Sequence, residues 1–297
     1  MSNNKEKELI SIIDKYYTDA PAYQPTEGGI RINQIGFMDN LYDDPMQVAT
    51  QIVISSFNSY SFESQYIYTF PITAEMIVAR FGFTSRPSDK VKKVILTIQE
   101  LVDKGIVSCS VDAKSIKKNT SFVIHQDITK KSIASIREKK GVAYTTIENH
   151  EFMKLISPRS ELTDTQTINI LAVYGAIVSR INTYNPEGHR TGFAYGNRLL
   201  NAVATQSYNT IGKTINLAKS SVDSYIHLLI ELKVIASIKV STGRGESYVW
   251  SRYYSKYSER IILKEFIKWL VKEGYPETDK LSYINIKDVW AEKKYPQ

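Results

Sequence analysis

Between residues 45 and 126 the hydrophobic positions recur at helical spacing in three successive segments. The first segment opens with Asp44-Pro45, an acidic cap before a proline at the first helical position, and runs through PMQVATQIVISSFNSYS. The second begins after Thr73, an expected N-cap, and stops at Gly82. The pattern therefore predicts two helices in the first part of this region.

A third helix and a β-hairpin are predicted next. Ser88 is the expected cap of the helix, whose apolar side chains recur every three or four residues and which ends at Gly105. Two strands follow, IVSCSV (106–111) and TSFVIH (120–125), and they flank the polar loop DAKSIKKN. Three helices followed by a hairpin with a basic tip is the element order of a winged helix, a form of the helix-turn-helix.

The second half of the chain shows the same order of elements. A long helix is expected over TDTQTINILAVYGAIVSRINTYN (163–185), with its first residue as the cap, and a short helix over SYNTIGKTIN (207–216). A third helix is capped near Ser220, and two strands are expected at 235–240 and 247–253. This order again predicts a winged helix.

The two halves also match residue by residue. With an offset of 128, six apolar positions coincide: Val94, Ile98, Leu101, Val102, Ile106 and Val107 fall on Val222, Ile226, Leu229, Ile230, Val234 and Ile235. The position of Gly105 is taken by Lys233, so we do not expect the two helices to share a C-terminal cap. A repeat of this length indicates two domains rather than a solenoid.

The sequence therefore predicts a mainly α (α+β) chain with small β-hairpins, built from two tandem winged-helix (helix-turn-helix) domains plus a C-terminal helix. The expected parts are an N-terminal arm (1–44), winged-helix domain 1 (45–126), a basic linker (127–160), winged-helix domain 2 (161–255) and a C-terminal helical tail (256–297).

Charge is distributed unevenly along the 297 residues, whose net charge is +7. Residues 1–44 hold 4 basic and 8 acidic side chains, so the rest of the chain is distinctly basic and suits a polyanionic partner. No apolar run approaches the roughly 20 residues that span a bilayer. The N-terminus lacks the apolar core of a signal peptide. We expect a cytoplasmic protein with no membrane partner.

Candidate DNA-binding residues follow from the position of each predicted helix-turn-helix, because the second helix enters the major groove with its N-terminal residues toward the bases. In the first domain they lie at this helix start and in the wing: Arg86, Ser88, Lys90, Lys92, Lys93, Lys114, Lys117 and Lys118. In the second domain they lie on both helices and in the wing turn: Lys213, Lys219, Ser220, Ser221, Ser224 and Arg244. Lysines and small hydroxyls suit phosphate contacts, and an arginine in a flexible turn suits the minor groove.

Catalytic and cofactor chemistry is not predicted. The string Ile211-Gly212-Lys213-Thr214 resembles the end of a P-loop, but Ser207 stands where the loop needs its first glycine. The single cysteine and four scattered histidines show no metal-ligand spacing. We therefore expect no enzyme activity, no metal and no cofactor.

The order of three helices and a wing, twice, with a basic linker resembles the tandem winged-helix replication initiators of bacterial plasmids and related mobile elements. The string YNTIGKTINLAKSSVDSYIHLLIELKVI is also similar to winged-helix domains of primosome and replisome-organiser proteins. The resemblance covers about residues 45–255. It implies binding to repeated sites in an origin, recruitment of host helicase or primosome proteins, and formation of a homodimer. By position it adds Tyr225 to the base-reading segment.

Three functions remain open at this stage. A replication initiator predicts a long asymmetric site on double-stranded DNA, because two domains engage two adjacent major grooves. A winged-helix transcriptional regulator, repressor or partition adaptor predicts a dimer on a palindrome. A protein–protein interaction module of a primosome predicts no salt-dependent affinity for DNA.

Overall fold

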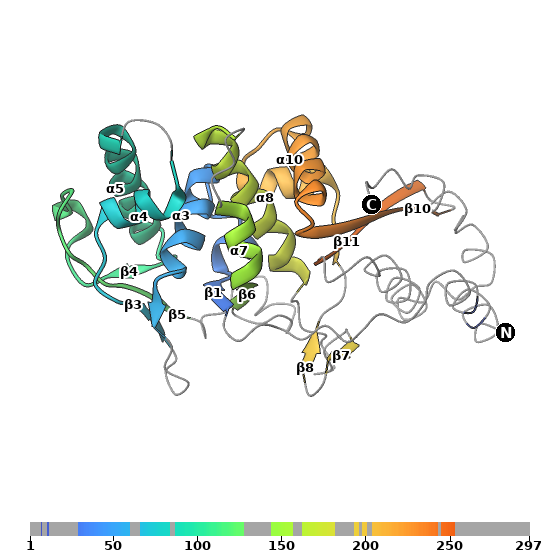
Figure 1. Ribbon diagram of the computed structural model, residues 1–297, viewed down its shortest axis with the longest axis horizontal. Helices are drawn as coiled ribbons and strands as arrows, with labels where there is room; N and C mark the ends of the chain where they lie inside the picture. The colour runs from blue at the N-terminus through green and yellow to red at the C-terminus, as the bar shows by residue number, and fades with distance from the viewer. Residues whose placement is uncertain are drawn as a thin grey trace. The chain divides into compact units, whose positions relative to one another are not determined.

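The computed structural model describes residues 7, 11, 29–59, 66–83, 87–127, 144–156, 162–181, 193–195, 198–200, 204–242 and 245–252. In these residues it contains eight α-helices and four small antiparallel sheets (Figure 1). The expected mixture of helices with small β-sheets is confirmed. No helix in the described part of the chain is long and apolar enough to cross a membrane.

Two compact units make up the chain. One contains residues 25–189 and 208–228, and the other contains 1–24, 190–207 and 229–297. This division differs from the predicted domain boundaries, because the larger unit gathers helices from both predicted domains. The expected C-terminal tail (256–297) lies outside the described residues.

The first two helices begin as predicted. Helix α3 (Pro45–Ser55) is capped by Asp44, whose side chain accepts a hydrogen bond from the Gln47 backbone N–H at 3.1 Å. Helix α4 (Ala74–Phe81) is capped by Thr73, whose hydroxyl accepts from the Met76 N–H at 3.3 Å. It ends at Gly82, which has a left-handed φ of 67°.

Helix α5 (Pro87–Asp103) begins two residues earlier than expected. Ser88 is therefore inside the helix and is not its cap, because the fixed φ of proline suits the first helical position. The helix ends as predicted at Gly105, whose φ is 65° and whose N–H donates to the Val102 carbonyl at 2.9 Å.

Four strands form one sheet beside these helices, in the order β2 (Asn58–Ser59), β3 (Tyr66–Thr69), β5 (Ile124–Asp127) and β4 (Ser108–Cys109). Strand β2 lies in the run that the sequence assigned to the first helix, so that prediction was too long. The Phe70 N–H donates to the Phe57 carbonyl at 3.3 Å and the two rings stack edge to face, so pairing across the sheet overrides helical spacing here.

The second half is built from helices α8 (Asp164–Ile181), α9 (Tyr208–Ile215) and α10 (Lys219–Glu231). The start of α8 is a capping box, in which Thr163 and Gln166 each bind the other's backbone N–H. Strands β9 (Ala204–Thr205), β10 (Ile235–Thr242) and β11 (Gly245–Arg252) form a sheet in the order β10-β11-β9. A further hairpin pairs β7 (Phe193–Tyr195) with β8 (Arg198–Leu200).

The two halves share their connectivity. Each begins with a long helix, continues through two or three short strands, and then runs helix, helix, strand, strand. In each sheet the last strand lies between the strand directly before the helix pair and the strand directly after it. The six apolar pairs of the repeat also agree in burial: five pairs are buried in both halves, and Val102 and Ile230 are both half-buried. The sequence repeat is therefore a structural repeat.

One expectation about the repeat was wrong. Lys233 has a left-handed φ of 52°, and its N–H donates to the Ile230 carbonyl at 2.9 Å. The equivalent bond of Gly105 is also 2.9 Å long. The same cap therefore closes both helices, because the backbone bond does not depend on the side chain at this position.

Parts of the expected arm and linker belong to the larger unit. Strand β1 (Gly29–Asn33) and helix α2 (Ile35–Met38) come from the arm, and strand β6 (Tyr144–Glu148) and helix α7 (Asn149–Ile156) from the linker. Strands β1 and β6 pair antiparallel along their full length.

Buried amides attach β1 to the neighbouring elements. The Gln51 amide of α3 donates to the Asn33 carbonyl at 3.3 Å and to the Gln126 side chain of β5 at 3.1 Å. All three side chains are at most 1% exposed. Because buried polar groups need partners, this set of bonds specifies how β1, α3 and β5 meet.

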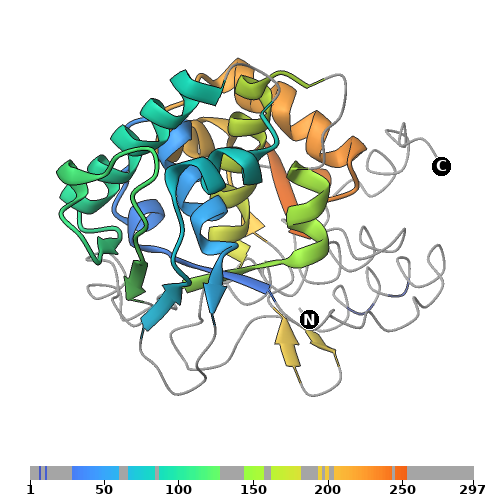
Figure 2. The same ribbon diagram turned by 60° about the vertical axis from the view of Figure 1, so that its left-hand side comes forward.

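Helices α3 and α8, the first helices of the two halves, pack side by side at the centre of the larger unit (Figures 1 and 2). Their residues 46–55 and 168–179 are buried throughout, which is typical of helices surrounded by protein. Gly175 allows the close approach, because a Cβ there would lie 2.9 Å from the Ile52 Cδ1 atom. The two halves of the repeat thus share one core.

Candidate nucleic-acid interface

The exposed face of α5 is basic toward its start and acidic toward its end. Two lysines, Lys92 and Lys93, are exposed in the first half of the helix beside one acid, Asp89, and the exposed Ser88. Glu100 and Asp103 are exposed in the second half. A polyanion would therefore meet favourable charge only near the N-terminus of α5. This is also the end where free backbone N–H groups favour anions.

Lys90 lies on a different side of α5. Its ammonium group forms an ion pair with Asp164 of α8 at 3.1 Å and lies 5.2 Å from the centre of the Phe83 ring. Only 25% of the side chain is exposed. Lys90 therefore binds its own protein, although the sequence placed it among the DNA contacts.

The loop between β4 and β5 carries three of the predicted lysines. Lys114, Lys117 and Lys118 are all exposed. The loop has internal bonds, since Asp112 accepts from the Lys114 N–H at 3.0 Å and Thr120 accepts from the Lys117 N–H at 2.9 Å. The ammonium of Lys118 pairs with Glu75 of α4 at 2.8 Å, in an exposed ion pair of small energetic effect.

The start of α10 presents a small, polar surface. Lys219, Ser220 and Ser224 are exposed there, and Lys213 is exposed on the last turn of α9. The Ser224 hydroxyl donates to the Ser220 carbonyl at 3.2 Å, so it is held along the helix. Compared with α5, this face has fewer charges and more hydroxyl groups.

Two residues of α10 that the sequence placed among the DNA contacts are only partly exposed. Ser221 and Tyr225 are half-buried. The Tyr225 hydroxyl accepts a hydrogen bond from the Asn169 amide of α8 at 2.9 Å. This contact directs the ring toward the protein's own helix, and we leave Tyr225 out of the DNA contacts proposed below.

The turn between α9 and α10 explains the residues that resemble a P-loop. The Leu217 N–H donates to the Gly212 carbonyl at 2.8 Å, and a Cβ on Gly212 would lie 2.3 Å from the Leu217 carbonyl oxygen. Glycine at 212 is thus required by a tight helix–helix turn.

Two of the predicted site residues, Arg86 and Arg244, lie outside the described residues.

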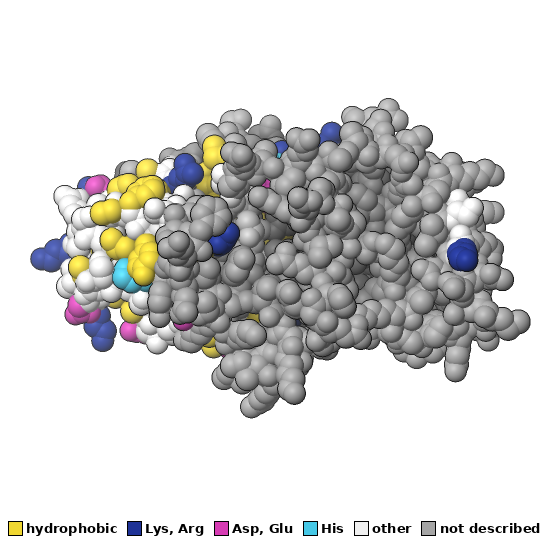
Figure 3. Space-filling model, turned by 90° about the horizontal axis from the view of Figure 1, so that it is seen from below, with side chains coloured by type: hydrophobic (Ala, Val, Ile, Leu, Met, Phe, Trp, Pro, Cys, Tyr) yellow, Lys and Arg dark blue, Asp and Glu magenta, His cyan; other side chains and the backbone are white. Residues whose placement is uncertain are grey.

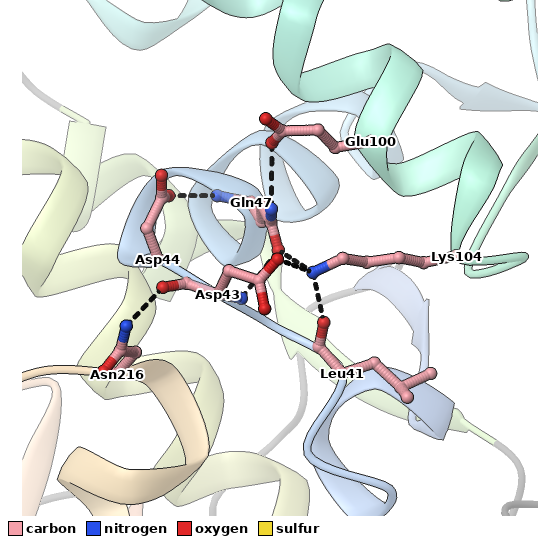
Figure 4. A network of polar contacts seen from close by, with 7 residues as sticks. All are labelled: Leu41, Asp43, Asp44, Gln47, Glu100, Lys104 and Asn216. Carbon is pink, nitrogen blue, oxygen red and sulfur yellow. Dashed lines mark hydrogen bonds and ion pairs between the residues drawn. The ribbon is translucent and has the colours of Figure 1, made fainter.

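A polar network joins the two halves near this turn (Figure 4). The ammonium of Lys104, the residue after α5, donates to the Asp43 carboxylate at 2.6 Å, to the Leu41 carbonyl at 2.5 Å and to the Gln47 side chain at 2.9 Å. The Asn216 amide, from the second half, donates to the Asp43 carbonyl at 2.6 Å.

Sequence reasoning missed Leu96, which is 58% exposed on the same face of α5 as Lys92 and Lys93. The sequence could have revealed this exposed leucine, because Leu96 lies outside the apolar stripe of the helix.

Hydrophobic side chains also gather beside a histidine on one part of the described surface (Figure 3). Tyr68 and Phe70 are 37% and 49% exposed, and the Tyr68 ring packs edge-on against His125.

Cys109 is the single cysteine of the chain. Burial raises the pKa of the half-buried Cys109 thiol, and backbone hydrogen bonds from Val111 and Ser110 oppose that shift. Within the described ranges no three acidic, histidine or cysteine side chains are grouped to hold a metal ion.

Comparison of the chain with protein-family models, with curated proteins and with solved structures finds no match.

Proposed function

We propose that the chain is a sequence-specific double-stranded DNA-binding protein whose two halves are winged-helix domains. The observation that carries the proposal is the repeated connectivity, in which two helices joined by a short turn are followed by a hairpin. In each sheet the strand before these helices pairs with the last strand of the hairpin. A second helix followed by a hairpin that can serve as a wing is the element order of a major-groove reader.

Charge on the first half supports the proposal. Lys92 and Lys93 on α5 and Lys117 in the wing are exposed and make no ion pair among the described residues. Free lysines on a helix and its adjacent wing suit phosphates on both sides of one groove. The first half is therefore proposed as the main source of affinity.

The second half is proposed to supply base recognition. Ser220 and Ser224 are exposed near the start of α10 and carry hydroxyl groups that bind base edges or phosphates. Lys219 begins the helix and Lys213 lies on the helix before it, so both suit the backbone beside the groove.

The proposed biological role is that of a replication initiator, which acts by binding DNA and not by catalysis. Its proposed partners are host helicase or primosome proteins in the cytoplasm. The two reading helices belong to one chain and present different side chains. One chain would therefore recognise two unlike half-sites, and a long asymmetric or directly repeated DNA site suits an origin.

The experiment is selection from a random duplex pool with the full chain, followed by fluorescence anisotropy on the selected duplex. We expect a consensus of about two helical turns without internal palindromy, since each reading helix takes one turn of DNA. A palindromic consensus would instead favour a dimeric regulator. No enrichment, with weak binding at low salt, would contradict DNA binding and leave the protein–protein module.

A further inference from the structure

We propose that Asn216 is a positioning residue that fixes the two helix-turn-helix segments at one separation, so that the protein discriminates DNA sites by the spacing of their two halves. This inference rests on the proposed DNA-binding function. The inference goes beyond that function because Asn216 is not proposed to contact DNA. It acts through the turn that precedes α10.

Asn216 connects the second turn to the first half of the repeat. It lies between α9 and α10 with a left-handed φ of 52°, and its side-chain amide donates to the Asp43 carbonyl at 2.6 Å. Asp43 stands directly before Asp44, the cap of α3. The start of α10 is thus attached to the loop that caps a helix of the other half.

Asp43 is attached in turn to the end of α5. Its carboxylate accepts from the Lys104 ammonium at 2.6 Å, and Lys104 follows α5 by one residue (Figure 4). The end of one reading helix and the beginning of the other are therefore linked through Asp43. Gln47 strengthens this link, since its side chain binds both Lys104 and Glu100 at 2.9 Å.

A second set of contacts fixes both helices on α8. Lys90 of α5 pairs with Asp164 at 3.1 Å, and Tyr225 of α10 accepts from Asn169 at 2.9 Å. With α8 packed against α3, the reading helices have little freedom to change their separation. Because each base pair turns the duplex by about 34°, inserting 2 base pairs rotates one half-site by roughly 70° against the other.

The chain offers a matched control for Asn216. Glycine adopts a left-handed φ freely, so Asn216→Gly keeps the backbone and removes the amide that binds Asp43. Asn40 has the same φ of 52°, is exposed, and its side chain makes no hydrogen bond within the described part of the chain. Asn40→Gly therefore makes the same chemical change without breaking the link.

The experiment compares the selected duplex with a version that carries 2 extra base pairs between its halves. We expect the unaltered protein and Asn40→Gly to prefer the original spacing by at least about tenfold, because one half-site is lost on the altered duplex. We expect Asn216→Gly to reduce this preference to about threefold or less. Lys104→Met breaks the same link from the α5 side and should act alike.

The outcomes separate the two proposals. If Asn216→Gly and Lys104→Met keep the full preference for spacing, the positioning role is wrong while DNA binding stands. If the unaltered protein shows no preference for the original spacing, the proposal that the two helices are held at a fixed separation is wrong. If the unaltered protein does not bind duplex DNA, the proposed function fails first. Circular dichroism checks folding, and Lys104→Met decides the question if Asn216→Gly unfolds.

Discussion

Single residues in the turns have the clearest consequences for stability. Gly212, in the last turn of α9, and Asn216, just after that helix, meet different demands. Gly212 must lack a Cβ because the Leu217 carbonyl occupies the space, whereas Asn216 only needs to accept a left-handed backbone. The string that resembles a phosphate-binding loop is thus explained by chain geometry.

Replacing Gly212 by alanine should lower the free energy of unfolding by about 1–3 kcal/mol, because the new Cβ overpacks against a backbone carbonyl. Urea unfolding followed by circular dichroism measures the change. The neighbouring exposed substitution Lys213→Ala serves as the control and should stay within about 0.5 kcal/mol. Equal stability of both variants would contradict the tight turn.

Leu96 is a single residue suited to read a base, because an exposed leucine on a basic helix face can contact the methyl group of a thymine. If it makes this contact, replacing one thymine of the selected site by uracil should weaken binding about fourfold, the equivalent of about 0.8 kcal/mol for one buried methyl group. The Leu96→Ala variant should not sense that replacement. Equal sensitivity of both proteins at every thymine would exclude the contact.

Individual elements show how far sequence reasoning reaches. The caps Asp44, Thr73 and Thr163 were predicted, because a cap is a local pattern of one side chain and one nearby N–H. The end of α3 and the pairing of β1 with β6 were not predicted. Both depend on contacts with residues far along the chain, and the spacing of apolar residues within one helix carries no information about such contacts.

The shared cap of α5 and α10 gives a prediction at this scale. Gly105→Ala should destabilise the protein by about 1 kcal/mol, because a residue with a Cβ is strained in the left-handed region. Lys233→Gly should stabilise it by up to about 1 kcal/mol for the same reason. Thermal unfolding of the two variants tests the equivalence of the positions, and changes of the same sign would contradict it.

On the scale of the whole molecule, the repeat could be predicted from the 128-residue offset, but the joining of its halves could not. The sequence suggested two domains separated by a basic linker. The structure instead buries α3 against α8, and residues of the expected arm and linker form a sheet in the same unit. Nothing in either apolar pattern distinguishes a helix packed within its own domain from one packed against the other.

The candidate site was predicted in part for similar reasons. Basic residues at the start of a helix were recognised from position alone, and Lys92 and Lys93 are exposed there. Lys90 and Tyr225 occur in the same segments but bind α8. Their partners, Asp164 and Asn169, lie more than 50 residues away along the chain, so only the fold shows that these side chains are already engaged.

The most direct test of the account measures duplex affinity by fluorescence anisotropy across salt for two charge-matched double variants. Lys92→Gln with Lys93→Gln removes two charges from the exposed face of α5, and Lys154→Gln with Lys233→Gln removes two elsewhere. Because each lost phosphate contact reduces the log–log salt slope by about 0.9, we expect the first pair to reduce it by roughly 1.8 and to weaken binding strongly. We expect the second pair to change the slope little. Equal slopes for both pairs would contradict the placement of the DNA interface on α5.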